Sequence, residues 1–408
     1  MVNEEHNKID RRNFLKNIGA AGLTAAFASD QLKADPNAVA KKQETQLPQV
    51  PKRKLGKTGV EVSCFALAHP WDLTENQIIL NKALQWGINH WDTATGYTGG
   101  KSELGIGKFL KNNPQVRSKV FIATKATRAA KTADDYEKLL AKSLVQMNTN
   151  YIDLYYAYQF ESGDQLTEQL RQWAQSAKKR KLIRFFGFST HKNMAQCLAA
   201  AAKTEWIDAV ITRYNFRQMQ DAEMRDAIEA CYKAGIGLTA MKIQAKQLET
   251  AEDKKLADHF LQRGFTEGQA KIKIVLEDKR ISSVCVGVEN VALLNEDVAA
   301  VLDKTKLSQS DREVFAEYAR QTCSGYCAGC GHICDSLLPD MPYLSDIMRY
   351  LMYYNSYGQH DRAKKLFAQI PRRIRDKLPA IDYTTVEARC PQHLAISRLV
   401  AEAVSKLA

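Results

Sequence analysis

Short apolar runs alternate with amphipathic segments between about residue 60 and residue 290. The segments 75–87 and 136–147 place their apolar residues at helical spacing. Eight intervening runs have the length of buried strands. They are Val62–Ala66, His90–Thr93, Val120–Ala123, Tyr151–Tyr156, Arg184–Phe188, Ala209–Thr212, Gly237–Met241 and Ser283–Gly287. The pattern therefore predicts strands that alternate with helices.

The spacing of these strands indicates how the sheet closes. Successive strands begin 25 to 33 residues apart, except for a last gap of 46 residues that leaves room for an inserted loop. Repeated strand–helix units of this size favour a parallel sheet with right-handed crossovers. Eight such units predict an α/β fold of the (β/α)8 TIM barrel class.

Two glycine-containing segments could instead indicate a nucleotide-binding fold. An open dinucleotide-binding sheet usually carries G-x-G-x-x-G after its first strand. The nearest match, "GIGKFL" at 105–110, lacks the third glycine and lies within a predicted helix, where small residues allow close helix packing. The "GGKS" at 99–102 lacks the first glycine of a phosphate loop, because Thr95 occupies that position. Lys101 is therefore expected to be a surface lysine.

Polar residues follow the predicted strands at the rim where barrel enzymes place their catalytic groups. Asp92 ends the second strand, Tyr97 lies in the loop behind it, Lys125 follows the third strand and Tyr158 the fourth. The later strands are followed by Ser189, Arg213, Met241, Lys242 and Gly287. The rim therefore collects a set of residues suited to proton transfer.

Tyr97, Lys125 and Asp92 suggest a specific chemistry. A phenol with a pKa of about 10 is a poor acid at neutral pH. A nearby ammonium favours the phenolate and is expected to lower that pKa, and a carboxylate keeps the ammonium charged and oriented. Tyr97 would then protonate a carbonyl oxygen while a hydride reaches the carbon.

Residues 53–305 resemble the aldo/keto reductase family. "RKLGKTGVEVSCFALA" (53–68) is similar to the opening strand pair of the family, and "GINHWDTATGYTGGKSELGIGKFL" (87–110) to its signature segment. "VFIATKA", "YIDLYY", "GFSTH" and "YNF" continue the match. The resemblance implies that Asp92, Tyr97 and Lys125 take the catalytic positions of the family, and that the substrate is a small carbonyl or alcohol.

The sequence departs from the family at two rim positions. The catalytic histidine of the family, which orients the carbonyl, falls at Tyr158. A phenol can also donate a hydrogen bond to an oxyanion, although Tyr158 is alternatively a packing residue at the barrel mouth. Met241 stands where many members place an aromatic residue that stacks on nicotinamide.

The resemblance also implies a dinucleotide cofactor. "VGVENVALLNED" (286–297) is similar to the last phosphate- and adenine-binding loop of the family, with Gly287, Glu296 and Asp297 in the expected places. Ser189 and Lys242 complete the expected cofactor-binding set. No Arg or Lys lies between residues 287 and 297 to meet a 2′-phosphate. The choice between NADP and NAD therefore stays open.

Five of the nine cysteines lie after residue 320. "CSGYCAGCGHIC" has the spacing C-x3-C-x2-C-x3-C from Cys323 to Cys334, and Cys390 follows directly before Pro391. Thiolates at such spacing converge on an iron–sulfur cluster or on zinc, and disulfides are the alternative in an oxidising compartment. The iron–sulfur interpretation is favoured.

The Cys-Pro pair helps to choose the ligands. In bacterial ferredoxins the cysteine before proline serves the other cluster of a pair. Here the remaining cysteines of a second motif would fall at Ala380, Tyr383 and Val386, so only one cluster is expected. The predicted [4Fe–4S] ligands are Cys323, Cys327, Cys330 and Cys390. The rival set is Cys327, Cys330, Cys334 and Cys390. The other cysteines, Cys64, Cys197, Cys231 and Cys285, are expected to be buried and inert.

The N-terminus resembles a twin-arginine export signal. Arg11 and Arg12 precede the mildly apolar run 17–28, which is too short to span a bilayer. Small residues allow cleavage after Ala28 or Ala40. We expect a periplasmic or otherwise exported protein with a signal peptide at 1–28, a linker at 29–52, a barrel at 53–305 and a mainly helical, ferredoxin-like iron–sulfur module at 306–408. We expect no stable transmembrane segment after signal cleavage.

The net charge of the chain bears on which classes of partner it can bind. The 408 residues carry 58 basic and 46 acidic side chains, a net charge of +12. The basic runs at 362–367 and 372–377 are interpreted as solvated helix faces, and without a recognised motif no nucleic-acid partner is expected. The leading hypothesis is an exported NAD(P)-dependent oxidoreductase, with a redox partner protein for the cluster. The alternative is a non-catalytic or electron-carrier protein on the same scaffold.

Overall fold

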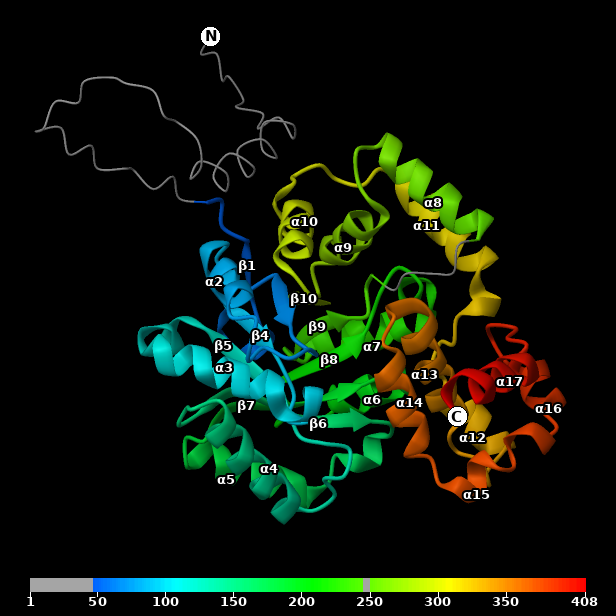
Figure 1. Cartoon of the computed structure of the whole chain (residues 1–408), viewed down its shortest axis with the longest axis horizontal. Helices are drawn as coiled ribbons and strands as arrows, with labels where there is room; N and C mark the ends of the chain where they lie inside the picture. The colour runs from blue at the N-terminus through cyan, green and yellow to red at the C-terminus, as the bar shows by residue number, and fades with distance from the viewer. Residues whose placement is uncertain (1–46, 245–249) are drawn as a thin grey trace, which may run out of the picture. The chain divides into compact units, whose positions relative to one another are not determined.

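Eight parallel strands close into a barrel in the computed structural model, which describes residues 47–244 and 250–408 (Figure 1). The closed order is β10-β3-β4-β5-β6-β7-β8-β9. The strands are β3 (Phe65–Ala68), β4 (His90–Asp92), β5 (Phe121–Lys125), β6 (Ile152–Phe160), β7 (Ile183–Thr190), β8 (Ala209–Arg213), β9 (Gly237–Met241) and β10 (Ser283–Gly287). The predicted (β/α)8 class is confirmed.

The prediction of the first strand as one element is wrong, because the structure divides this run between two strands. The run Val62–Ala66 is divided at Cys64 between β2 (Glu61–Ser63) and the barrel strand β3. β2 pairs antiparallel with β1 (Lys52–Lys54) outside the barrel sheet. Leu55 and Val62 of this hairpin are fully buried in the cluster that fills the barrel interior. One apolar run therefore supplies residues to two strands in different sheets, because both strands bury side chains in the same core.

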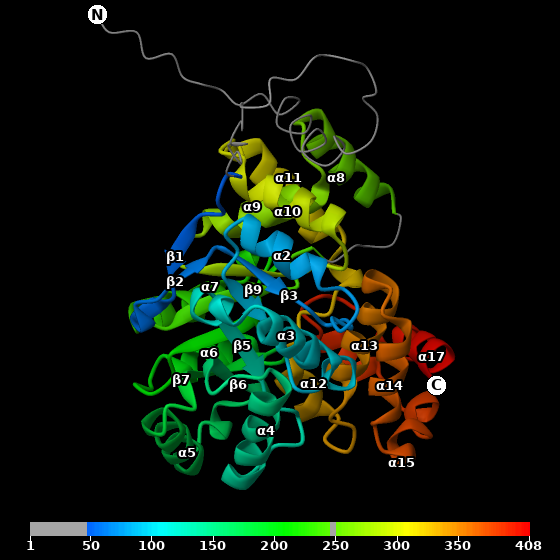
Figure 2. The same cartoon turned by 60° about the vertical axis from the view of Figure 1, so that its left-hand side comes forward.

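Helices connect the barrel strands and cover the outside of the sheet (Figures 1 and 2). They are α2 (Ile78–Gln85), α3 (Lys101–Asn112), α4 (Ala133–Gln146), α5 (Glu168–Lys179), α6 (Met194–Ala201), α7 (Ala222–Lys233), α8 (Ala251–Gln262), α9 (Glu267–Glu277) and α10 (Val291–Leu302). A Cβ at Gly105 would collide with Leu73, and one at Gly107 with the backbone at Gln146. The two glycines of α3 therefore serve close packing, as the sequence predicted.

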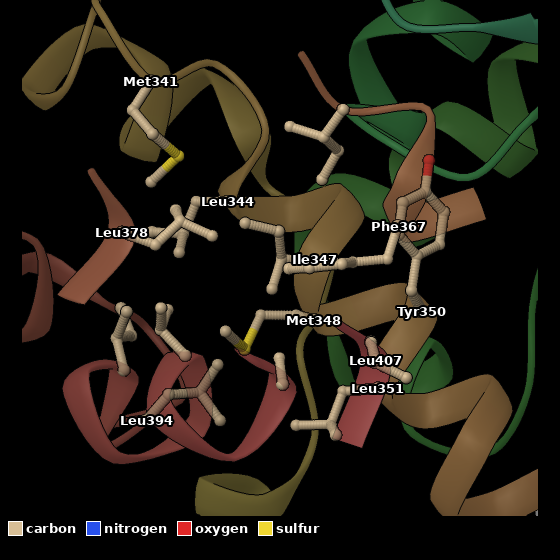
Figure 3. Packing of buried hydrophobic residues seen from close by; sticks show 14 of the residues in the cluster. Met341, Leu344, Ile347, Met348, Tyr350, Leu351, Phe367, Leu378, Leu394 and Leu407 are labelled. Atoms are coloured by element: carbon tan, nitrogen blue, oxygen red, sulfur yellow. The ribbon is translucent and has the colours of Figure 1, made fainter. Parts of the chain in front are cut away.

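The segment after residue 305 is helical and has a core of its own. Its helices are α11 (Gln309–Gln321), α12 (Gly331–Leu337), α13 (Leu344–Tyr357), α14 (His360–Ala368), α15 (Arg372–Arg375), α16 (Thr384–Arg389) and α17 (Ile396–Leu407). Figure 3 shows the core that the helices after α11 share, in which Ile347 and Met348 of α13 face Leu394 and Leu407 from the end of the chain. α11 packs instead on the barrel side, where Phe315 contacts Phe216 and Phe260. Residues 326–408 are called the C-terminal module below.

The C-terminal module packs against the rim at which the barrel strands end. Both views show α13 and α14 on one side of the barrel (Figures 1 and 2). Arg128, behind β5, donates to Asp346 of α13 at 2.9 Å. Arg213, at the end of β8, donates to the backbone carbonyl of Cys327 at 3.0 Å. The module thus lies over the predicted active site.

The predicted export signal and linker fall almost entirely in residues 1–46, outside the described part of the chain. Within the described part, no helix has both the length and the apolar character needed to cross a bilayer.

Candidate active site and cysteine pocket

Asp92 and Lys125 form a buried ion pair at the rim. They end the neighbouring parallel strands β4 and β5, whose register places Asp92 opposite Ala123. The Lys125 Nζ donates to Asp92 Oδ1 at 2.5 Å and to the Thr93 carbonyl at 2.7 Å. Burial by itself lowers the pKa of Lys125, but Asp92 and Tyr97 outweigh it and the pKa lies above its ordinary value. The lysine therefore keeps its charge at neutral pH.

Tyr97 lies beside this pair. The chain turns sharply after it, because Thr98, Gly99 and Gly100 all have positive φ angles before α3 begins. The Lys125 Nζ lies 5.2 Å from the centre of the Tyr97 ring. Burial raises the pKa of Tyr97 and Lys125 opposes this without reversing it, so the expected lowering of that pKa is not found. Tyr97 is protonated at neutral pH, which is the form a general acid needs.

Tyr158 completes the predicted catalytic group. It lies near the end of β6, is partly buried and interacts electrostatically with Tyr97. It also interacts with Arg349 of α13 and Arg362 of α14. The structure therefore brings together all four predicted catalytic residues, and it adds two arginines that the sequence interpretation missed.

The predicted cofactor residues on strands β7, β9 and β10 have different environments. Ser189 is buried and its Oγ accepts from the Gln159 backbone N–H at 2.8 Å, which holds the end of β6 in place. Lys242 places its Nζ 4.5 Å from the ring centres of both Tyr353 and Tyr357. Gly287 is exposed, and a Cβ there would stand 2.9 Å from the Trp71 ring.

Glu296 and Asp297 lie on α10, which follows the last barrel strand. Glu296 accepts from Thr266 at 3.0 Å, and Asp297 accepts from Gln244 at 2.6 Å. Burial raises the pKa of Asp297 to about 7. Phosphate groups bind in this barrel class near the ends of strands seven and eight, here β9 and β10. Gly287 and the start of α10 fit that role, and the two carboxylates suit a ribose hydroxyl better than a phosphate.

Of two basic residues whose surroundings were predicted, Lys101 agrees with its prediction and Arg362 does not. Lys101 is a surface lysine as expected: its side chain is 59% exposed and pairs with Asp72 at 2.7 Å. Arg362 opens the basic run 362–367, for which the sequence predicts a solvated helix face, and this prediction is wrong for Arg362. Its guanidinium is partly buried and lies 5.5 Å from the centre of the Tyr97 ring.

Four cysteines line one cavity in the C-terminal module. They are Cys327, Cys330, Cys334 and Cys390, from the loop before α12, from α12 and from the end of α16. Met348, Leu394 and Ile396 supply apolar walls. Cys323 lies outside this lining, so the cavity collects the rival ligand set of the sequence analysis. All nine cysteines are free thiols, and Cys64, Cys197, Cys231 and Cys285 are buried as predicted.

Two glycines let the cysteine loop approach the barrel. Gly329 has a φ of +82°, and a Cβ there would stand 2.7 Å from the His191 carbonyl and collide with Arg213. A Cβ at Gly331 would collide with Lys192. The Asn193 backbone N–H donates to the Gly329 carbonyl at 2.7 Å. The cysteine pocket is therefore anchored directly on the ends of β7 and β8.

The barrel is similar to known proteins in sequence and structure. The sequence profile of the Aldo/keto reductase family matches residues 65–266. L-galactose dehydrogenase of Arabidopsis thaliana is 25% identical over 295 residues, which cover 65% of this chain and 92% of the relative. The aldo-keto reductase AMT2 of Alternaria alternata is 26% identical over 330 residues, with 64% and 89% covered.

Solved structures share the fold. The thermostable aldo-keto reductase Tm1743 superposes with a TM-score of 0.57 at 24% identity and covers 66% of this chain and 99% of its own. The aldo-keto reductase AKR11C1 of Bacillus halodurans gives 0.56 at 19% identity, with 66% and 96% covered. The eight-stranded barrel, the segment that matches the family profile and these relatives agree: the barrel of this chain is similar to the aldo/keto reductases in sequence over residues 65–266 and has their fold.

Proposed function

We propose that this protein is an exported NAD(P)-dependent reductase that interconverts a small carbonyl compound and its alcohol, with Tyr97 as the general acid and base. The observation that supports this most directly is the contact group at the rim. The Asp92–Lys125 ion pair is buried and measures 2.5 Å, and the lysine ammonium lies 5.2 Å from the Tyr97 ring.

Each residue has a separate part in the reduction. Tyr97 holds a proton at its hydroxyl and gives it to the carbonyl oxygen. The charge of Lys125 then stabilises the phenolate that remains, because an ammonium in a site shielded from water acts strongly on a nearby anion. Asp92 keeps Lys125 charged and pointed toward Tyr97. Tyr158 donates a hydrogen bond to the same carbonyl oxygen, in the position where the family has histidine.

Ser189, Gly287, Glu296 and Asp297 would hold the dinucleotide, which supplies the hydride when it is bound. Lys242, predicted for the same set, places its Nζ against the rings of Tyr353 and Tyr357. Glu296 favours NAD, since a carboxylate repels a 2′-phosphate and accepts from a ribose hydroxyl. The family resemblance favours NADP. Comparing titrations with NADH and NADPH decides between these two cofactors.

Tyr97→Phe tests the catalytic proposal, because it removes the hydroxyl and keeps the ring. We expect kcat for carbonyl reduction to fall by about 10²–10⁴-fold, while the Kd for the dinucleotide changes by less than about twofold. A variant that retains wild-type kcat would overturn the role of Tyr97.

The alternative is a non-catalytic electron carrier on this scaffold, and Tyr158 in place of histidine is the observation that favours it. If purified protein binds neither NADH nor NADPH, this alternative replaces the reductase.

We also propose that the cysteine pocket holds one [4Fe–4S] cluster on Cys327, Cys330, Cys334 and Cys390. A zinc ion needs four ligand atoms within about 2.3 Å of one point. Among residues 47–244 and 250–408, no set of three or more His, Cys, Asp or Glu side chains lies close enough together to hold a single ion. A [4Fe–4S] cluster takes four cysteine ligands, and four cysteines line this one cavity, which supports a cluster.

Two serine variants test the ligand set. After anaerobic purification, Cys334→Ser should lose most of its iron and its brown colour, whereas the matched variant Cys323→Ser should keep both. Retention of iron by Cys334→Ser together with its loss from Cys323→Ser would restore the first-predicted set. Zinc in place of iron in the wild-type protein would replace the cluster.

Export and a redox partner complete the proposal. The paired Arg11 and Arg12 support transport of an already folded protein, and replacing both with lysine should leave the protein in the cytoplasmic fraction. A hydride carries two electrons whereas a cluster passes one, so the proposed cluster would serve an external redox partner. Cys330 also borders a second, more open cavity lined by Asn193, Arg217 and Gln392, which supports access from outside.

A further inference from the structure

Four cationic side chains meet where the C-terminal module covers the barrel mouth. Arg213 ends β8, Lys242 follows β9, Arg349 lies on α13 and Arg362 on α14. All four interact electrostatically with the hydroxyl of Tyr353, which is 1% exposed. These four residues are called the mouth cations below. Two come from the barrel and two from the module.

The negative charge near the mouth cations is insufficient to neutralise them. Arg349 pairs with Asp346, but that carboxylate also pairs with Arg128. Asp92 is already held by Lys125. In the described part of the chain, no carboxylate forms an ion pair with Arg213, Lys242 or Arg362.

Neutral groups take up only part of the donor capacity of the mouth cations. Arg213 donates to the carbonyls of Cys327 and Ala328, and Arg362 donates to Gln359 at 2.9 Å. A buried cation with neutral partners alone is costly, since burial removes the water that stabilised its charge. The arrangement therefore has a surplus of positive charge inside the protein.

Polar atoms among the mouth cations also lack partners. Within residues 47–244 and 250–408, the Tyr353 hydroxyl, the Arg213 Nε and the His191 Nδ1 are buried without a hydrogen bond. Arg213 is 3% exposed. Buried polar groups are nearly always hydrogen-bonded in folded proteins, so three unpartnered groups beside surplus cations indicate where a polar ligand belongs.

The electrostatic state of Lys242 and Tyr353 agrees with this surplus. Burial, together with Arg362 and Arg349, lowers the pKa of Lys242 to about 8. Burial alone would raise the pKa of Tyr353, but Lys242 and the three arginines outweigh it and lower that pKa to about 8. A ligand that carries negative charge would offset the excess positive charge and move both pKa values back toward their ordinary values.

We propose that the mouth cations bind an acidic group, a carboxylate or a phosphate, on the substrate itself. The Arg362 guanidinium lies 5.5 Å from the Tyr97 ring, so an acidic group held there places the rest of a small molecule beside the proposed general acid. The substrate is then an anionic carbonyl compound or the matching hydroxy acid or phosphorylated alcohol. This inference rests on the proposed function for the role of Tyr97, but the anion site itself does not require turnover.

Binding is tested first, without any reaction. Benzoate and inorganic phosphate are titrated into the full-length protein by calorimetry, with Tyr97→Phe and Arg362→Gln as variants. We expect the wild type and Tyr97→Phe to bind at least one of the two anions with similar Kd, and Arg362→Gln to bind it at least tenfold more weakly. The matched control is Arg372→Gln, since that side chain is 87% exposed on α15, and it should bind like the wild type. Absence of binding to the wild type overturns the site.

Turnover then separates the substrate from the cofactor as the source of the acidic group. We expect Arg362→Gln to raise KM for 4-carboxybenzaldehyde at least tenfold and to change KM for its methyl ester by less than twofold. Equal KM changes for the acid and the ester would overturn the substrate assignment. A tenfold loss of NADH and NADPH affinity in Arg362→Gln would assign the mouth cations to cofactor phosphates instead. If anions bind but no carbonyl compound is turned over, the anion site stands and the proposed reductase activity fails.

Discussion

Two groups of buried charge lie at the same barrel mouth, and they are balanced differently. In the first, the ammonium of Lys125 meets the carboxylate of Asp92 and the Thr93 carbonyl. In the second, Lys242 lies between two tyrosine rings and has no carboxylate partner in the described part of the chain. A balanced buried charge is held in place by the protein itself, whereas an unbalanced one is stabilised only when a ligand arrives.

The two groups also differ in origin. Asp92 and Lys125 end adjacent strands, so closing the barrel is sufficient to bring them together. The mouth cations come from β8, β9, α13 and α14, so they meet only when the C-terminal module is docked. The first group is a property of the barrel, and the second is a property of the whole chain.

The largest effect is expected from Lys125→Met, which leaves Asp92 buried without its partner. Removing one partner of a buried ion pair costs about 3–5 kcal/mol in the free energy of unfolding. The loss is measured by urea denaturation of the variant and the wild type, both without cofactors. The double variant Asp92→Asn with Lys125→Met should regain part of this loss, because no charge is then left unpaired. A loss below about 1 kcal/mol for Lys125→Met would show that the pair is not buried in solution.

A smaller effect is expected from Gly329→Ala, which strains the contact between the C-terminal module and the barrel. The new methyl group meets Arg213 and the His191 carbonyl at a φ of +82°, and such strain costs about 1–3 kcal/mol. Gly325→Ala is the matched control, since a Cβ there has open space, and its stability should change by less than about 1 kcal/mol. Anion binding should weaken in Gly329→Ala, because Arg213 is displaced, and should stay unchanged in Gly325→Ala. If both variants unfold at the same urea concentration, the tight contact at Gly329 is refuted.

The smallest effect is expected from Lys242→Met. Its loss of contact with two tyrosine rings offsets the removal of an unpaired cation, so stability near pH 7 should change by less than about 1 kcal/mol. The contrast with Lys125→Met tests whether charge balance distinguishes the two groups.

The pH dependence sharpens the same comparison. The folded pKa of Lys242 is about 8, below the value of about 10.4 in an unfolded chain. Between these values the unfolded chain binds more protons, so stability rises with pH in the wild type. Tyr353 acts in the same direction, because its folded pKa of about 8 also lies below the value of about 10 in an unfolded chain. The urea midpoint of the wild type should therefore rise relative to that of Lys242→Met when the pH is raised from about 7.5 to about 9.5. A constant difference would contradict this coupling.

The chain's periodicity was sufficient to predict the barrel and the meeting of Asp92 and Lys125 at its rim. Strand ends of one parallel barrel share a rim whatever the loops contain, so spacing places Asp92 and Lys125 together, whereas Tyr97 lies in a loop and was placed beside them by the family resemblance. The Cys-Pro pair, compared with the ferredoxin spacing, predicted that cysteines more than fifty residues apart share one site, and it left two ligand sets open. Docking of α16 against α12 is what gathers Cys334 and Cys390 around one cavity and leaves Cys323 outside its lining.

Other properties depend on burial, which no local pattern reveals. Arg362 stands in a basic run typical of a solvated helix, yet it lies beside Tyr97 because α14 packs over the mouth. The pKa of Tyr97 is raised because that cover removes water, although its lysine neighbour alone would lower it. Spacing along the chain thus decides which residues share a strand end or a helix face, since backbone geometry repeats locally. The balance of charge at this site arises from segments far apart in sequence, since only their packing excludes the solvent.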